Sequence, residues 1–155
     1  MEKDIEGLLT EYPFFKDMTT SHRALIAGCG KNVVFDTGEL LARTGEPANA
    51  FFAIRHGRMS IELHSPERGP LILQTLEAGD IVGWSWLFPP YHWKFDVRAV
   101  EQVRAISFDG ACLRGKCERD PAMGYEFMKR FAQVFMERLE ATRLQLLDLY
   151  GNVSR

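Results

Sequence analysis

Short apolar runs broken by glycines fill the middle of the chain, over residues 31–108, and they constrain the fold more than any other feature. Apolar and polar residues alternate within the runs, which is the period of a strand with one buried face. Glycines supply the turns between the runs. Strands at this spacing are typical of an all-β sandwich or roll. The runs cover residues 33–35, 39–43, 50–54, 59–63, 71–77 and 93–100.

The segments on both sides of these runs carry helix signals. The N-terminal segment predicts two short helices, the second capped by the Thr-Thr-Ser cluster at 19–21 and ended by Gly28 and Gly30. The C-terminal segment begins with an Asp-Pro start signal, has no further proline, and predicts one long helix. We expect a single domain, residues 1–155, with helices over 1–30, a β-roll over 31–110, a helix over 121–150 and no DNA-binding domain.

Apolar residues recur along the predicted C-terminal helix at spacings of three and four, as in a coiled-coil seam. A helix of roughly 30 residues is about 45 Å long, longer than the β domain that it would cover. We therefore expect its far end to pack on a second copy and to form a homodimer. The alternative is that the stripe packs only on its own sandwich. The seam residues are Met128, Phe131, Phe135, Leu139, Thr142, Leu146 and Leu149.

Charge and targeting signals exclude several classes of protein. Nineteen basic and 21 acidic residues give a net charge of −2, which argues against nucleic-acid or membrane binding through bulk charge. No run reaches the roughly 18 apolar residues of a spanning helix, and the N-terminus carries charges where a signal peptide needs apolar residues. We expect a cytoplasmic protein with no nucleic-acid or membrane partner.

The cysteines and histidines show no metal or redox pattern. Cys29, Cys112 and Cys117 form no CxxC pair, and we expect buried free thiols. The chain has no HxH or HExxH spacing, no nucleophile motif and no glycine-rich phosphate loop. We therefore expect no metal site and no enzymatic activity. The four histidines, predicted to lie in loops or on the surface, are His22, His56, His64 and His92.

Aromatic residues are concentrated in one short window. Six of the 18 rings fall within residues 84–95, including all three tryptophans. In the run over residues 93–100, Trp93 and Phe95 lie on one face of the predicted strand, whereas Lys94 and Asp96 lie on the other face. We therefore expect Trp93 to face the interior and Lys94 to face solvent.

The order of these elements resembles the cyclic-nucleotide-binding domain of the catabolite-activator and kinase-regulatory superfamily. The resemblance implies a mainly β fold with flanking helices, in which a double-stranded β-helix, or jelly-roll-like roll, of eight strands precedes a long C-terminal helix. It also implies a regulatory module. The residues that carry it are 13–15, 35–39, 43–45, 50–54, 57–59, 79–83 and 97–99.

The family's phosphate-binding cassette lies where this chain has its aromatic window. In the family a glycine turn leads into a short helix whose amides face the phosphate, a glutamate holds the ribose, and an arginine neutralises the phosphate. Here Gly83 matches the turn, but Trp84 stands at the glutamate position and Trp93, or with a one-residue shift Lys94, at the arginine position. Tryptophan has one N–H donor and no charge. Each lost charge-assisted contact costs about 1.5–3 kcal/mol, which argues against the usual binding of cAMP or cGMP.

Two functions follow from the resemblance. The first is a sensor module that binds a flat or apolar molecule on Trp84 or Trp93, or an anion on the backbone donors of residues 83–86. The second is a ligand-free dimeric scaffold whose tryptophans fill the pocket. No cofactor is assigned, although His92 stays open as a haem ligand because some members of the wider superfamily bind haem. The candidate ligand-binding residues are Gly83, Trp84, Ser85, Trp86, Trp93, Lys94, Thr142 and Arg143.

Two of these candidates lie on the C-terminal helix. Thr142 matches the position from which the family's helix contacts the nucleotide base. The alternative is that its hydroxyl bonds the preceding helical turn within the dimer seam. Arg143 is expected to face solvent or to pair with an acidic residue.

Overall fold

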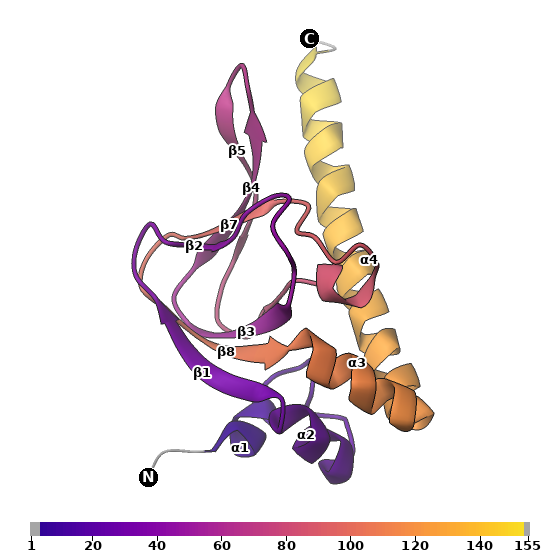
Figure 1. The fold of residues 1–155 in the computed structure, drawn as a ribbon. Coiled ribbons are helices and arrows are strands. Elements are labelled where there is room, and N and C mark those ends of the chain that lie inside the picture. The colour runs from indigo at the N-terminus through magenta and orange to yellow at the C-terminus, as the bar shows by residue number, and fades with distance from the viewer. Residues whose placement is uncertain (1–3, 154–155) are drawn as a thin grey trace.

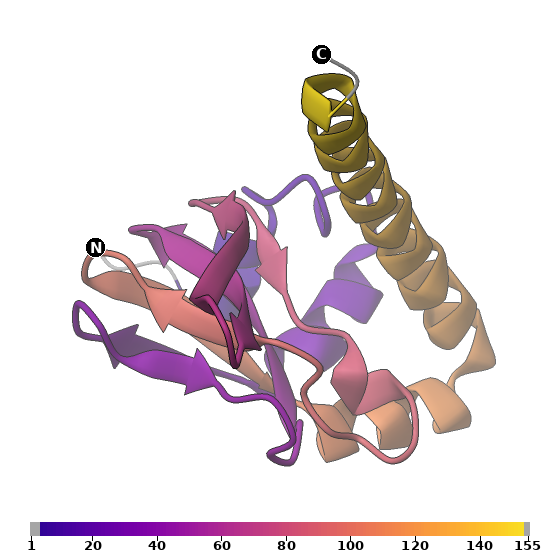
Figure 2. The ribbon, with the colours of Figure 1, turned by 90° about the horizontal axis from the view of Figure 1, so that it is seen from above.

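The computed structural model describes residues 4–153, so the ends of the predicted domain, residues 1–3 and 154–155, lie outside the described residues. Helices flank a roll of eight strands on two sides (Figure 1), and the view from above shows the long C-terminal helix running along one side of the roll (Figure 2). The elements are α1 (Ile5–Leu9), α2 (Thr20–Ala27), β1 (Gly30–Phe35), β2 (Leu40–Ala42), β3 (Ala50–His56), β4 (Met59–Ser65), β5 (Gly69–Leu76), β6 (Ile81–Val82), the 3-10 helix η1 (Ser85–Leu87), β7 (Asp96–Ala99), β8 (Val103–Asp109), α3 (Gly110–Arg119) and α4 (Pro121–Val153).

The eight strands form two antiparallel four-stranded sheets, in the orders β1-β8-β3-β6 and β2-β7-β4-β5. Alternate side chains of both sheets meet in one apolar core inside the roll, which includes Ile54, Val97 and Val103. This arrangement confirms the predicted mainly β, jelly-roll-like fold.

Strand β3 is buried on both of its faces, which explains its unbroken apolar run. Phe52 and Ile54 point into the roll, whereas Phe51 and Ala53 belong to a second core beneath the helices. The sequence of a strand that is covered on both faces is continuously apolar rather than alternating. The sheet that contains β3 therefore forms the middle layer between the second sheet and the helices.

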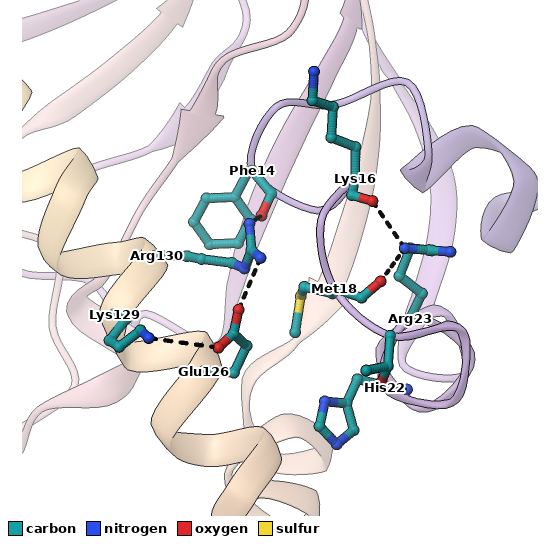
Figure 3. Close-up of polar contacts among 9 residues, drawn as sticks. Phe14, Lys16, Met18, His22, Arg23, Glu126, Lys129 and Arg130 are labelled. Carbon is teal, nitrogen blue, oxygen red and sulfur yellow. Dashed lines mark hydrogen bonds and ion pairs between the residues drawn. The ribbon is translucent and has the colours of Figure 1, made fainter.

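The N-terminal segment packs against the base of α4 through a set of polar contacts (Figure 3). The Arg130 guanidinium donates to the Phe14 carbonyl at 2.9 Å and to the Glu126 carboxylate at 2.8 Å. The Arg23 guanidinium donates to the carbonyls of Lys16 and Met18. The Arg130–Phe14 bond joins the N-terminal segment to α4, while the Glu126 bond holds the Arg130 side chain within α4 and the Arg23 bonds hold the turn before α2.

Helix α4 has two different halves. Its first turns bury Met123, Phe127 and Phe131 completely against the roll and the N-terminal segment. Its last turns extend beside the β4–β5 hairpin and leave apolar side chains in solvent, including Leu144 and Leu147, which are 55% and 66% exposed (Figure 1). Among the predicted seam residues, Phe131 is buried in the monomer, while Leu139, Leu146 and Leu149 are exposed. Within residues 4–153, no helix carries an apolar stretch that could cross a bilayer.

Three local predictions differ from the structure. Cys29 and Cys112 form a disulfide with their Cα atoms 5.9 Å apart, so the prediction of buried free thiols was wrong for both; Cys117 is a free thiol but only half-buried. The reason is the pairing of β1 with β8, which brings the residue before β1 next to the first turn of α3.

The other two differences lie in elements that sequence periodicity marked poorly. Helix α3 was not predicted, because glycine and charged residues obscure its apolar face. Strand β7 begins only at Asp96, because the backbone of Trp93 bonds instead with the turn at Gly45 and Glu46.

Candidate functional site

A cavity of about 420 Å³ lies between the β4–β5 hairpin, the residues around η1 and the middle of α4. Its volume lies within the roughly 300–1,000 Å³ range of small-molecule sites. Trp84 and Thr142, both predicted as ligand contacts, line this cavity together. Eight of its twelve lining residues are apolar, and none is acidic.

Trp84 forms one wall of the cavity. It is half-buried, and its ring packs edge-on against Phe135 and Phe95, with ring centroids 5.0 and 6.0 Å away. The guanidinium carbon of Arg138 lies 5.3 Å from the centroid of the indole. Such ring and cation contacts hold the indole in place while one side faces the cavity.

Gly83 and Trp93 fit against each other inside the roll. Gly83 has a φ of +100°, and a Cβ added there would lie 2.6 Å from the Trp93 ring. Trp93 is 5% exposed and Lys94 is exposed, so the predicted parity of the two residues is confirmed. Neither side chain lines the cavity. Trp93, one of the two positions predicted for the family's arginine, is therefore an indole in the core of the roll.

Ser85 and Trp86 are core residues in this structure. Trp86 has no exposed surface, stacks on Phe51 with ring centroids 5.5 Å apart, and touches Phe127 and Phe131 of α4. Ser85 is buried beside it, and neither side chain lines the cavity. The three tryptophans of the aromatic window therefore divide into one at the cavity and two in cores.

The two α4 candidates have different surroundings. The Thr142 hydroxyl donates to the Arg138 carbonyl at 2.9 Å, so its side chain both bonds the preceding turn and lines the cavity. Arg143 is exposed, makes a 3.9 Å ion pair with Glu140, and lies outside the cavity lining.

Arg138 is the cavity residue that sequence reasoning missed. One guanidinium nitrogen, Nη2, donates to the Ile81 carbonyl, while Nη1 is buried without a partner. Burial lowers the pKa of this guanidinium, while the charge of Asp80 acts in the opposite direction. Its position four residues before Thr142 was the available signal, because residues four apart share a helix face.

The histidines offer no metal centre. His56, His64 and His92 are exposed, and the ring of His22 lies 3.7 Å from Asp120. Among the described residues, no group of three or more metal-binding side chains gathers.

Comparisons with known proteins agree with this architecture. The sequence profile of the cyclic nucleotide-binding domain matches residues 32–120. A candidate cyclic nucleotide-binding protein of Geobacter metallireducens has a crystal structure that superposes with a TM-score of 0.78 at 27% identity, covering 90% of this chain and 99% of that one. A cyclic nucleotide-binding domain from Methylobacillus flagellatus superposes with a TM-score of 0.79 at 15% identity, covering 94% of this chain and 82% of that one.

Two curated relatives are longer proteins. A candidate potassium channel protein of Rhodopseudomonas palustris is 29% identical over 94% of this chain, and a CRP-like cAMP-activated global transcriptional regulator of Mycobacterium tuberculosis is 24% identical over 94%. The chain spans 34% of the first and 63% of the second, less than two thirds of either. With the profile match over residues 32–120, the chain belongs to the cyclic nucleotide-binding domain family.

Proposed function

We propose that this domain is a non-enzymatic regulatory sensor whose small-molecule site is the cavity beside Trp84 and Thr142. The open volume between these two residues carries the proposal, since a scaffold with a filled pocket would leave none. The lining comes from the roll and from α4, so a ligand would contact both. A ligand that prefers one arrangement of roll and helix would shift the population between arrangements.

The proposed ligand is not cAMP or cGMP bound in the family's usual way. Two observations support this: Trp93, one of the two predicted arginine positions, is buried while the other, Lys94, is exposed, and Trp84 offers no carboxylate for a ribose. Calorimetric titration with cAMP and cGMP tests this part. We expect no micromolar binding of either nucleotide, and micromolar binding would contradict this view of the cassette.

The cavity itself is tested with a neutral, environment-sensitive naphthalene dye such as Prodan. We expect the dye to bind the wild type with increased fluorescence and to lose binding in Ala141→Trp, because Ala141 lines the cavity and an indole there would fill it. Thermal unfolding controls for the fold of the variant. Unchanged dye binding in Ala141→Trp, or no binding in the wild type, would contradict the sensor and favour the scaffold.

The exposed half of α4 supports the further proposal of a homodimer. Its location in the cytoplasm stays a prediction from the sequence. Leu144, Leu147 and Leu149 are all more than half exposed and lie on a helix that extends beside the hairpin (Figure 1). Burial of each such side chain would contribute about 1.5–3 kcal/mol. Light scattering is expected to give twice the monomer mass, and Leu147→Asp to give a monomer. A wild type that stays monomeric at all concentrations would contradict the dimer.

The same exposed half favours the second candidate function, a dimeric scaffold or interaction module. Under that function the cavity would have no ligand, and α4 would carry the whole activity. The dye experiment separates the two candidates because it reports on the cavity and not on the dimer.

A further inference from the structure

We propose that the cavity takes small organic acids with an apolar, aromatic body, and that Arg138 binds their carboxylate. This inference rests on the proposed sensor function and specifies its ligand class. It depends on the charge, the unpaired nitrogen and the apolar walls of the same cavity.

Charge is the first line of support. Among the described residues that line the cavity, Arg138 is the single charged one; the remaining polar ones are Gln74, Thr142 and Gln145. Asp80 and Glu137 act on the same guanidinium from outside the cavity lining, so the lining itself presents one positive charge beside an apolar volume and favours a ligand with one negative charge. A dianion would leave a charge unpaired in an apolar site, which is costly.

The hydrogen bonding of Arg138 is the second line of support. Among the described residues, no carboxylate lies within ion-pair distance of its guanidinium. Nη2 is used on the Ile81 carbonyl, and one face of the group lies over Trp84. Nη1 is buried and unpaired, and a buried donor left without an acceptor is destabilising. Nη1 has essentially no accessible surface, so a carboxylate in the cavity would supply that acceptor by drawing the guanidinium toward the cavity, where its two oxygens match the planar fork of arginine.

The apolar walls of the cavity indicate what kind of body the ligand would have. The rings of Trp84, Phe95 and Phe135 surround the space, and aromatic pairs favour edge-to-face packing such as these rings already show. The hydroxyls of a ribose would lie against these rings with few partners, so burying them is unfavourable. A flat ring system with a single acid group fits both the rings and the cation.

A matched pair of probes tests the inference, namely 1-naphthaleneacetate and its neutral analogue 1-naphthaleneacetamide. We expect wild-type protein to bind the acid at least about tenfold more tightly than the amide, by calorimetry, because the acid adds a charge-assisted bond. In Arg138→Gln the two affinities should become equal, while Arg138→Lys should keep part of the preference. Lys129→Gln, which removes an exposed charge of α4 outside the cavity, should change neither affinity.

The outcomes separate this inference from the function on which it rests. Equal binding of acid and amide by the wild type would overturn the role of Arg138 and leave the sensor cavity in place. Failure of both probes, together with failure of the neutral dye, would overturn the cavity as a ligand site and the inference with it. Arg138 also bonds Ile81, so thermal unfolding and amide binding by Arg138→Gln show whether the variant keeps its fold.

Discussion

Two groups of aromatic side chains contrast with each other: one is packed in a closed core, and the other lines an open cavity. The closed cluster, defined as Phe14, Phe51, Trp86, Phe127 and Phe131, has four members without exposed surface and one, Phe14, at 8%. The cavity wall, defined as Trp84, Phe95 and Phe135, comes from the same sequence window and the same helix α4 but borders about 420 Å³ of open space. Aromatic content alone therefore does not distinguish a core from a site.

The difference lies in which side chains the neighbouring elements contribute. Rings from the N-terminal segment, β3, η1 and α4 converge on the closed cluster, and Phe14 lies 5.0 Å from Phe131 between ring centroids. At the cavity wall the opposite side is the β4–β5 hairpin, which offers Ile61 and Leu73 but no ring. The volume that a ring would fill stays open, and Arg138 stands at its edge. The predictions below test this contrast.

The largest effect is expected in the closed cluster. Trp86→Ala should lower the free energy of unfolding by about 3–5 kcal/mol, because it leaves a cavity among packed rings. Urea denaturation followed by circular dichroism measures the loss, and Trp86→Phe, which keeps a ring against Phe51, should lose much less. A loss below about 1 kcal/mol for the alanine variant would mean that the cluster is not the main core.

The disulfide on the edge of the closed cluster should contribute the next largest effect. Replacing both Cys29 and Cys112 by serine is expected to lower the free energy of unfolding by about 2–4 kcal/mol, because the bond closes a long loop in the unfolded chain. Reduced wild-type protein should match this double variant. Thiol labelling of denatured, unreduced protein should modify one cysteine, Cys117, and labelling of all three would contradict the bond.

Trp84→Ala should have a smaller effect on stability and a larger one on binding. The residue is half-buried and already borders open space, so we expect a loss of about 1–2 kcal/mol in denaturation. Binding of the naphthalene probes should fall by at least about tenfold, a change of about 1.4 kcal/mol. A stability loss equal to that of Trp86→Ala would show that both rings are core residues.

Arg143→Gln should have the smallest effect. The side chain is exposed and its ion pair with Glu140 is 3.9 Å long, so unfolding should change by less than about 0.5 kcal/mol. The affinity for 1-naphthaleneacetate should also stay unchanged. A clear loss of affinity would move the site along α4 toward the position predicted from sequence.

Much of the fold was predictable because its signals are local. Glycine turns and apolar runs mark six of the eight strands, all but β6 and β8, and spacings of three and four mark α4. Parity alone placed Trp93 inside and Lys94 outside. Helix α3 escaped because glycines and charges obscure its period. The disulfide escaped because only the pairing of β1 with β8 brings together two cysteines that are 83 residues apart, one before β1 and one in α3.

The site was harder to predict than the fold. Trp84 and Thr142 were named in advance and line one cavity, but Trp86 and Trp93, named with them, lie in cores. Which ring of a cluster faces open space depends on the shape of distant elements, here the β4–β5 hairpin. Arg138 was missed because an arginine on an amphipathic helix usually faces solvent, and only the packing of Trp84 against α4 places it at the cavity.

The central claim is that the cavity wall is open to ligands while the closed cluster is not. The most direct test of this claim is fluorine NMR of protein labelled with 5-fluorotryptophan. The three resonances are assigned with single Trp→Phe variants, and 1-naphthaleneacetate is then added. We predict that the Trp84 resonance shifts with probe concentration while the Trp86 resonance stays in place. A shift of Trp86 without one of Trp84, or no shift of any resonance at millimolar probe, would contradict the account.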